Sequence, residues 1–420
     1  MSFISDFRRR GDRWWRYGVL KLAYQEAQQA PGQENHSLQA VFKRFRYARP
    51  SEELVAVWRL LVDAGAIRSP ALSEGKVGEV GQAIAILSPQ THRPAVWLDL
   101  YRLGLGVGLF VPAQRFRQKA IEAMLVESEY PHASLAMLTA GSYAAIETGD
   151  FIRASELLER MKSKGVGQSR YQQGRWLVQL LGGMAPAGIT ELAIDDDEPD
   201  ALFRKSVQGN RLALVGPVAT KVRNGAEIDN HDLVVKFGYR GGDVGKDPGT
   251  QGLKLNVSYY NNKQAEQLSE TSYNDVLADL HWAVFNNQKG RSFLPKRMPK
   301  VRQLESLQWL MPDTHLNAGP NAVLDLLRFG PSSLAIYNTD MMLSSGRFAG
   351  YKASDEKSID YTRSFIKTHD PVVQFLVMHR LWSLGRIKGD ERFESVMAMG
   401  LDQYLLRLQE AYGARTQALI

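Results

Sequence analysis

The hydrophobic pattern of the chain changes near residue 211, and this change limits the possible folds more than any other feature. After this point, short apolar runs alternate with turn residues and with longer stretches of helical character. Short buried strands that alternate with helices are typical of an α/β domain built on a parallel sheet. We therefore predict a mostly parallel, Rossmann-like sheet, with strands at residues 212–216, 233–237, 253–259, 282–285 and 334–337.

The part of the chain before this change has the pattern of helices. Ala154, Leu158 and Met161 recur on one helix face behind a candidate N-cap at Asp150. Together with the apolar stretch at residues 135–146, they predict a tetratricopeptide-like helical hairpin. No fixed repeat period is evident elsewhere. We expect an all-α, degenerate repeat-like domain over residues 1–190, a linker over residues 191–208 and the α/β domain over residues 209–420.

Composition narrows the class of protein and of ligand. The 420 residues are 44% hydrophobic and 23% charged, which indicates a globular chain of about two domains. The 52 Lys and Arg residues outnumber the 45 Asp and Glu residues, and this balance suits an anionic ligand or surface. The chain has no Cys, so disulfides and thiolate metal sites are excluded and a reducing compartment is expected.

Targeting signals also favour a cytoplasmic protein. The basic start of the chain is not followed by an apolar stretch, so we expect no signal peptide. The longest uncharged apolar stretch, residues 103–114, is too short to span a bilayer. The N-terminus nevertheless combines Arg8, Arg9 and Arg10 with Trp14 and Trp15. This combination predicts peripheral contact with an anionic lipid surface, or else helix packing.

Residues 212–238 form the first candidate ligand-binding segment. A predicted strand runs into a glycine, whose missing side chain lets the backbone approach a ligand. A dense group of polar residues then precedes the next strand. Its two aspartates could equally cap turns. The candidates of this segment are Gly216, Pro217, Asn224, Glu227, Asp229, His231 and Asp232.

Residues 316–340 form the second segment. Asn317, Ala318 and Gly319 stand at the predicted start of a helix, with Pro320 in a position that favours helix initiation. The free N–H groups and the positive dipole end of a helix start can bind a phosphate or a carboxylate. The alternative is an ordinary loop, helix and strand, of the kind that such sheets contain several times.

The third segment places a histidine directly before a helix. Asp370 is the predicted N-cap and Pro371 the first helical residue, so His369 lies at the positive end of the helix dipole. That position disfavours imidazolium and should lower the pKa of His369. A neutral imidazole can take a proton from a sugar hydroxyl.

Taken in order, the three segments resemble the sequence motifs of the animal-type sialyltransferases, which use CMP-sugars. The large motif matches Val215-Gly216, Gly225 and the run from Glu227 to Asp232. The small motif matches Asn317-Ala318-Gly319, and the very small motif matches His369 with Gln374. The resemblance covers residues 208–385. It implies a sialyltransferase-like fold, a CMP-sugar donor between Gly216 and Gly319, a role for His369 as general base, and neither a metal nor a cofactor.

The chain also departs from these motifs. Pro217 and Val218 replace an Asn and a Ser, Gly238 replaces an Asn, and Gln374 replaces the usual Glu. The cysteine pair and the membrane anchor of the secretory enzymes have no counterpart. These differences point to a bacterial relative that makes surface polysaccharide. They leave the donor open between CMP-sialic acid and CMP-Kdo.

The sequence leaves the stereochemistry and the exact acceptor open. Direct attack would invert the anomeric centre, whereas a retaining enzyme would need a carboxylate nucleophile, for which Asp232 and Asp229 are the candidates. The expected acceptor is a glycan or glycolipid, and no nucleic-acid partner is expected. The alternative to an enzyme is a helical-repeat scaffold that carries an inactive transferase-like domain.

Two further charged patches have simpler interpretations. Asp195, Asp196 and Asp197 form an Asp-x-Asp pattern that can bind metal and sugar nucleotide, although a solvated acidic loop is the more common meaning. The basic stretch from Lys289 to Arg302 predicts a solvated face or a seat for an anionic acceptor.

Overall fold

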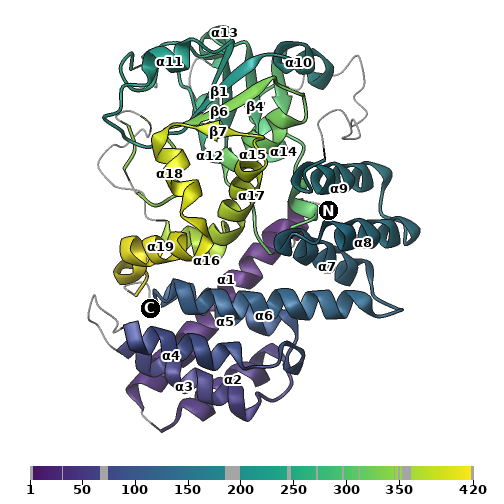
Figure 1. The fold of residues 1–420 in the computed structure, drawn as a ribbon, viewed down its shortest axis with the longest axis vertical. Coiled ribbons are helices and arrows are strands. Elements are labelled where there is room, and N and C mark those ends of the chain that lie inside the picture. Colours follow the sequence, from purple (N-terminus) through teal and green to yellow (C-terminus); the bar gives the residue numbers. More distant parts are fainter. Residues whose placement is uncertain are drawn as a thin grey trace.

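A computed structural model describes residues 3–30, 32–66, 74–184, 199–243, 247–270, 273–295, 298–311, 313–344, 346–348, 351 and 361–417. The side chains of residues 3–10 and the acidic run at residues 195–197 lie outside the described residues. Helices form the lower part of the molecule and an α/β unit forms the upper part (Figure 1).

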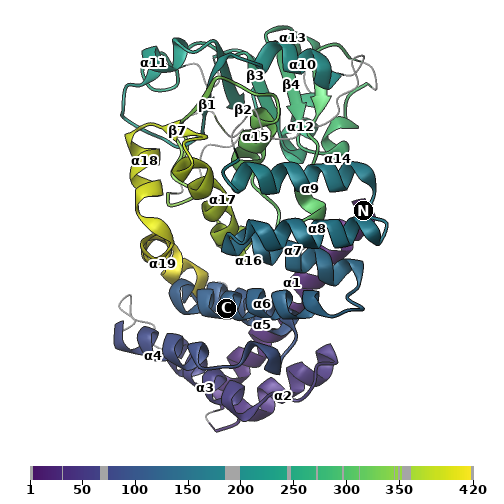
Figure 2. The same cartoon turned by 45° about the vertical axis from the view of Figure 1, so that its right-hand side comes forward.

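The helical part is a continuous array in which successive helices pack against each other, from α5 onward in particular. Figure 2 shows α6 to α9 as a stack between the sheet and α2 to α4, with α1 running past the stack. The helices are α1 (Phe3–Gln29), α2 (Glu34–Phe45), α3 (Glu52–Ala66), α4 (Glu74–Ala85), α5 (Pro94–Gly106), α6 (Phe110–Glu129), α7 (Leu135–Thr148), α8 (Phe151–Ser163) and α9 (Gln168–Leu181).

The predicted helical hairpin is confirmed as α7 and α8. The Asp150 side chain accepts the Arg153 N–H at 3.0 Å, which makes it the expected N-cap of α8. Gly149 ends α7 with a φ of 78°, a conformation that glycine adopts at little cost.

The α/β part is built on a seven-stranded sheet of order β5-β4-β3-β2-β1-β6-β7. Every pairing in it is parallel, as predicted. The strands are β1 (Arg211–Val215), β2 (Leu233–Phe237), β3 (Val257–Tyr260), β4 (Trp282–Phe285), β5 (Val301–Gln303), β6 (Ser333–Tyr337) and β7 (Lys388–Gly389).

Five of these strands are predicted by the sequence, and the differences have local causes. Strand β3 begins later than expected because the N–H groups of Leu253 and Lys254 bind the Asp229 carboxylate instead of a neighbouring strand. Strand β5 lies within the basic stretch for which the sequence predicts a solvated face. Its Arg302 is 2% exposed, so that prediction is wrong for this residue.

The two faces of the sheet are covered differently. Helix α11 covers one face of β1, β2 and β6, where Ile228 packs with Val215 and Tyr337. The other face joins a large apolar core that includes α15 and α17. The connecting and C-terminal helices are α10 (Pro199–Val207), α11 (Gly225–Asp229), α12 (Asn262–Ser269), α13 (Tyr273–Ala278), α14 (Gln288–Arg291), α15 (Ala318–Leu327), α16 (Thr362–Lys367), α17 (Pro371–Ser383), α18 (Glu391–Ala398) and α19 (Gly400–Gln417).

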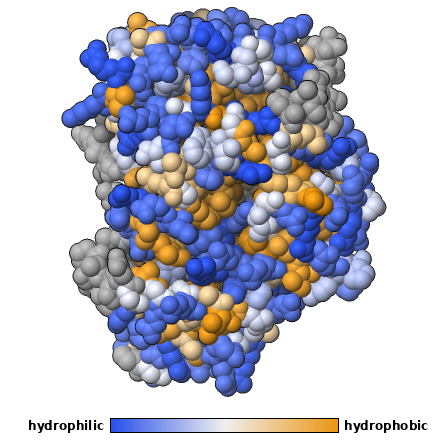
Figure 3. Space-filling view, viewed as in Figure 1, coloured by the Kyte–Doolittle hydropathy of each residue, from blue (hydrophilic) through white to orange (hydrophobic). Residues whose placement is uncertain are grey.

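One apolar core runs through both parts of the chain, from Tyr17 on α1 to Tyr412 on α19. Buried ion pairs also cross between them: Arg102 on α5 pairs with Asp313, and Arg117 on α6 pairs with Asp370. The surface over this junction is mostly hydrophilic with hydrophobic patches in its middle band (Figure 3). The helical part is therefore packed into the α/β part rather than tethered to it.

Several basic and aromatic side chains of the N-terminal helix contact other parts of the protein. Arg16 pairs with Asp99, and the Trp14 ring packs under the Arg363 guanidinium at 4.9 Å. Trp15 stays 45% exposed. No helix in the described ranges is long and apolar enough to cross a bilayer. Peripheral membrane contact through residues 3–10 stays a prediction, because their side chains are not described.

Candidate functional site

The loops after β1 and β6 meet at the carboxyl edge of the sheet. The Gly216 N–H donates to the Tyr337 carbonyl at 2.8 Å. A Cβ at Gly216 would lie 2.2 Å from Thr339 Oγ1, so no other residue fits between the two loops. Pro217 stays in the same loop, where its carbonyl accepts the Phe348 N–H at 3.1 Å. Packing alone thus explains the glycine at position 216.

The start of α15 reaches the same edge, because α15 leads into β6. Asn317 precedes the helix, and its Nδ2 lies 2.9 Å from the Met342 sulfur in the loop after β6. Ala318 is the first residue of α15. A Cβ at Gly319 would meet no heavy atom within 4 Å beyond its own helix. In contrast to Gly216, packing does not require a glycine at position 319. The space beside it is open, so a ligand can approach the helix start.

The ring of His369 is oriented by the loop before α15. His369 Nδ1 lies 2.8 Å from the carbonyl oxygen of His315. A carbonyl oxygen only accepts hydrogen bonds, so Nδ1 carries the proton and the lone pair of the neutral ring is on Nε2. The side chain is half-buried. His369 is therefore held in the tautomer that a general base needs.

Gln374 joins the second and third motifs. Its Oε1 accepts the Asn317 N–H at 2.8 Å, and its Nε2 donates to the His315 carbonyl at 2.9 Å. The side chain is completely buried. The amide can donate and accept at once, which a carboxylate cannot do. The structure thus brings Asn317, His369 and Gln374 into one hydrogen-bonded group.

The residue after His369 is anchored by the helical part of the chain. Asp370 caps α17 as predicted, with Oδ1 accepting the Val372 N–H at 2.9 Å. Tyr101 donates to the same carboxylate at 2.7 Å, and the Arg117 guanidinium pairs with it. Glu147 holds the other side of Arg117 at 2.7 Å. Burial raises the pKa of Asp370, and the charge of Arg117 opposes that rise.

The aspartates of the first motif lie at the other edge of the sheet. Asp232 pairs at 3.0 Å with Arg211, which is the first residue of β1, whereas Gly216 follows its last residue. Hydrogen bonds from Arg211 lower the pKa of Asp232 to about 2. Asp229 binds the Leu253 and Lys254 N–H groups at 2.9 and 2.8 Å. The structure therefore brings neither carboxylate beside His369, and a role of either as nucleophile stays a prediction.

The remaining candidates of the first motif cover the sheet face opposite α15. Glu227 accepts the Tyr337 hydroxyl at 2.7 Å, and the His231 ring packs edge-on against Tyr337 with 5.7 Å between ring centroids. Asn224 precedes α11 without a side-chain capping bond. The structure does not bring these residues together with His369.

Two buried residues at the carboxyl edge were not among the candidates. Asn338 and Asp340 follow β6 directly and are 1% and 2% exposed. Oδ1 of each has no hydrogen-bond partner, although Arg392 lies 3.2 Å from the other oxygen of Asp340. Asn338 also has a φ of 52°, in the left-handed region that asparagine adopts more readily than most residues. Their place after a predicted strand was the signal that could have identified them.

A metal centre is not evident in the described part of the chain, where no three His, Cys, Asp or Glu side chains come close enough together to hold an ion. The described residues thus give the carboxyl edge a half-buried histidine with an oriented ring, a helix start with open space, and two buried oxygens, Asn338 Oδ1 and Asp340 Oδ1, that lack a hydrogen-bond partner.

Comparisons with known proteins give likenesses to solved structures but no match to a family model or a curated protein. Among solved structures, the chain is similar to a mammalian sialyltransferase in complex with Gal-β-1,3-GalNAc-ortho-nitrophenol. The match covers 57% of this chain and 85% of the other, with 14% identity and a TM-score of 0.31. At that score the likeness establishes neither a common fold nor a common activity.

Proposed function

We propose that the protein is a glycosyltransferase that moves an acidic sugar, sialic acid or Kdo, from a CMP-activated donor to a hydroxyl of a glycan or glycolipid acceptor. The proposed setting is bacterial surface polysaccharide synthesis on the cytoplasmic side. The observation that carries the proposal is the hydrogen-bonded group of Asn317, His369 and Gln374, which joins two separate motifs at the edge where such sheets bind ligands.

In the proposed reaction, His369 Nε2 accepts the proton of the acceptor hydroxyl. The oxygen then forms a bond to the anomeric carbon of the donor, and the bond from that carbon to the CMP phosphate oxygen breaks. The electron pair leaves with CMP, and the proton stays on His369 until solvent removes it. General-base catalysis of this kind contributes about 10²–10⁴-fold to a rate.

The donor phosphate is assigned to the start of α15. The first N–H groups of a helix have no partner within the helix, and the dipole favours an anion there. Gly319 leaves the space beside these groups open. CMP is a good leaving group, so the proposed step requires no metal ion.

We propose inversion rather than retention. A retaining mechanism needs a carboxylate nucleophile near the base, and both sequence candidates bind elsewhere: Asp229 with the backbone before β3 and Asp232 with Arg211. A single displacement uses only groups that the described structure brings together.

Calorimetric titration with CMP tests the proposal and separates it from an inactive scaffold. The wild-type chain should bind CMP, and Gly319→Val should weaken binding at least tenfold because its methyl groups occupy the path to the α15 N–H groups. Gly18→Ala is the matched control, since a Cβ there also meets no neighbour within 4 Å. Absence of CMP binding by the wild type would contradict the proposal.

A donor assay then identifies the sugar. Wild-type protein incubated with CMP-sialic acid or CMP-Kdo should release CMP from one donor much faster than from the other. Equal and negligible release from both, despite CMP binding, would show a nucleotide-binding protein that does not transfer these sugars.

A further inference from the structure

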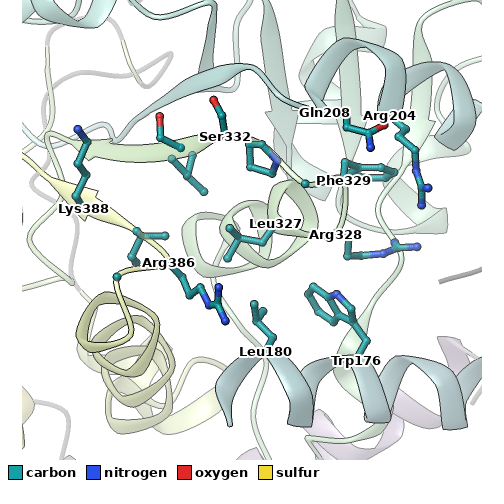
Figure 4. Close-up of a pocket in the computed structure, with 16 residues that line it drawn as sticks. Trp176, Leu180, Arg204, Gln208, Leu327, Arg328, Phe329, Ser332, Arg386 and Lys388 are labelled. Atoms are coloured by element: carbon teal, nitrogen blue, oxygen red, sulfur yellow. The ribbon is translucent and has the colours of Figure 1, made fainter. Parts of the chain in front are cut away.

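A second cavity lies at the amino edge of the sheet, away from the loops around Gly216. Its volume is about 350 Å³. Ser333 at the start of β6 and Lys388 at the start of β7 line it, together with the ends of α9, α10 and α15. Figure 4 shows Trp176 and Leu180 on one side, with Ser332 on the opposite side.

The charged side chains that line this cavity are all cationic. They are Arg204, Arg328, Arg386 and Lys388, and no carboxylate is among the lining residues that the structure describes. Of the nearby acids, Asp325 and Asp200 pair with Arg302 at 2.5 and 2.7 Å, and Glu305 pairs with Arg328 at 2.8 Å. Arg386 and Lys388 still leave the described lining with an excess of positive charge.

The Arg328 guanidinium is buried, but not all of its N–H groups have a hydrogen-bond acceptor. The side chain is 8% exposed, and its Nη2 pairs with Glu305 at 2.8 Å. Its Nε and Nη1 are buried and have no hydrogen-bond partner. Asp200 and Asp325 lie 3.9 Å away, beyond hydrogen-bond distance. A buried donor without an acceptor is unfavourable, so a bound acceptor here would be favourable.

Arg386, on the other side of the cavity, also has a buried nitrogen without a hydrogen-bond partner. One nitrogen donates to the Met184 carbonyl, whereas its buried Nε has no partner. Figure 4 shows its guanidinium extending toward the space between Leu327 and Leu180. Two arginines that line the cavity from different segments thus have buried N–H groups without an acceptor in the described structure.

We propose that this cavity is a second ligand site, which binds the phosphate or carboxylate group of a small anionic molecule. Guanidinium N–H groups match the paired oxygens of both anions. The apolar side chains of Trp176, Leu180 and Leu327 would contact the body of the ligand. The volume falls within the range of about 300–1,000 Å³ that is common for small-molecule sites.

Titration calorimetry of the full chain tests the proposal, with inorganic phosphate as the phosphate probe and free sialic acid as the carboxylate probe. Both titrations are run without CMP, because its own phosphate would compete with the probes for the cavity. At least one probe should bind, and the difference between them identifies the anion. Arg386→Gln and Lys388→Gln should each raise the Kd at least tenfold.

Lys205→Gln is the matched control, because Lys205 is an exposed cation on α10 that does not line the cavity. Its Kd should stay within twofold of the wild type. Lys388 is exposed, so its substitution keeps the test valid should Arg386→Gln impair folding. Failure of both probes to bind, or equal binding by wild type and both cavity variants, would overturn the proposal. These outcomes are independent of whether CMP binds.

Discussion

Two groups of polar residues border the same sheet and use their hydrogen bonds differently. In the group before β2, Asp229 and Asp232 are saturated by backbone N–H groups and by Arg211, so they hold loops in place. In the group around α15 and α17, hydrogen bonds fix the tautomer of His369 and join it to Gln374. In the described structure, the clustered aspartates thus make structural contacts, whereas the half-buried imidazole of His369 has a fixed orientation.

Replacing His369 should change activity more than any other substitution in the two groups. His369→Ala should lower the turnover number for sugar transfer by about 10²–10⁴-fold, because the acceptor hydroxyl loses its base. Steady-state assays of CMP release measure this loss. His132→Ala, which removes an exposed histidine of the helical part, should leave the rate unchanged. Near-full activity of His369→Ala would remove the chemical distinction between the two groups.

The anchor behind His369 should matter for stability. Arg117→Met leaves Asp370 and Glu147 buried without their cation, and breaking a buried pair in this way costs about 3–5 kcal/mol. Denaturant unfolding followed by circular dichroism measures the change. Arg115→Met is the control, because this exposed arginine of the same helix contacts only Gln118. A similar, small loss in both variants would show that Asp370 does not depend on the helical part.

Removing the link between the motifs should have an intermediate effect. Gln374→Leu leaves the Asn317 N–H without its acceptor, at a cost of about 1–3 kcal/mol. We also expect slower transfer, since the loop that orients His369 loses both of its hydrogen bonds to the Gln374 side chain. Unfolding and CMP-release assays on the same preparation would show both effects. Unchanged transfer with reduced stability would assign Gln374 to folding alone.

Substitution of Asp232 should have little effect. Its pKa is lowered to about 2 in the folded protein, so the stability from its contact with Arg211 is present at neutral pH and is lost as the pH falls through that value. The difference in melting temperature between wild type and Asp232→Asn should be slight at pH 7 and vanish toward pH 2. Transfer at neutral pH should be unchanged. A large loss of transfer would restore Asp232 as a reacting group.

Local patterns in the sequence predicted much of the fold. Short apolar runs identified the central strands and their parallel arrangement. Capping residues identified the N-terminal starts of α8 and α17, where Asp150 and Asp370 accept hydrogen bonds from backbone N–H groups. Strand β5 was missed because Arg302 interrupts its apolar pattern, and β7 because two residues carry no periodicity.

The arrangement of the site depends on contacts that no local pattern contains. Asp229 and Gly216 belong to the same motif segment of the sequence. In the folded chain, however, Asp229 lies beside Leu253, at the opposite edge of the sheet. Arg117 and Asp370 are separated by 253 positions, and only folding shows that they pair. Asn338 and Asp340 lacked a distinctive motif, and their unused oxygens become evident only when burial is known.

The close approach of α19 to the helical part matters for biosynthesis. A Cβ at Gly108, in the turn between α5 and α6, would lie 2.4 Å from the Gly413 carbonyl, and Tyr412 belongs to the common core. During translation, the apolar surface of α5 and α6 therefore stays partly uncovered until residues about 300 positions later in the chain have been synthesised. Such a nascent chain exposes unfinished core for most of its synthesis, which predicts a strong dependence on chaperones and insolubility of either part expressed alone.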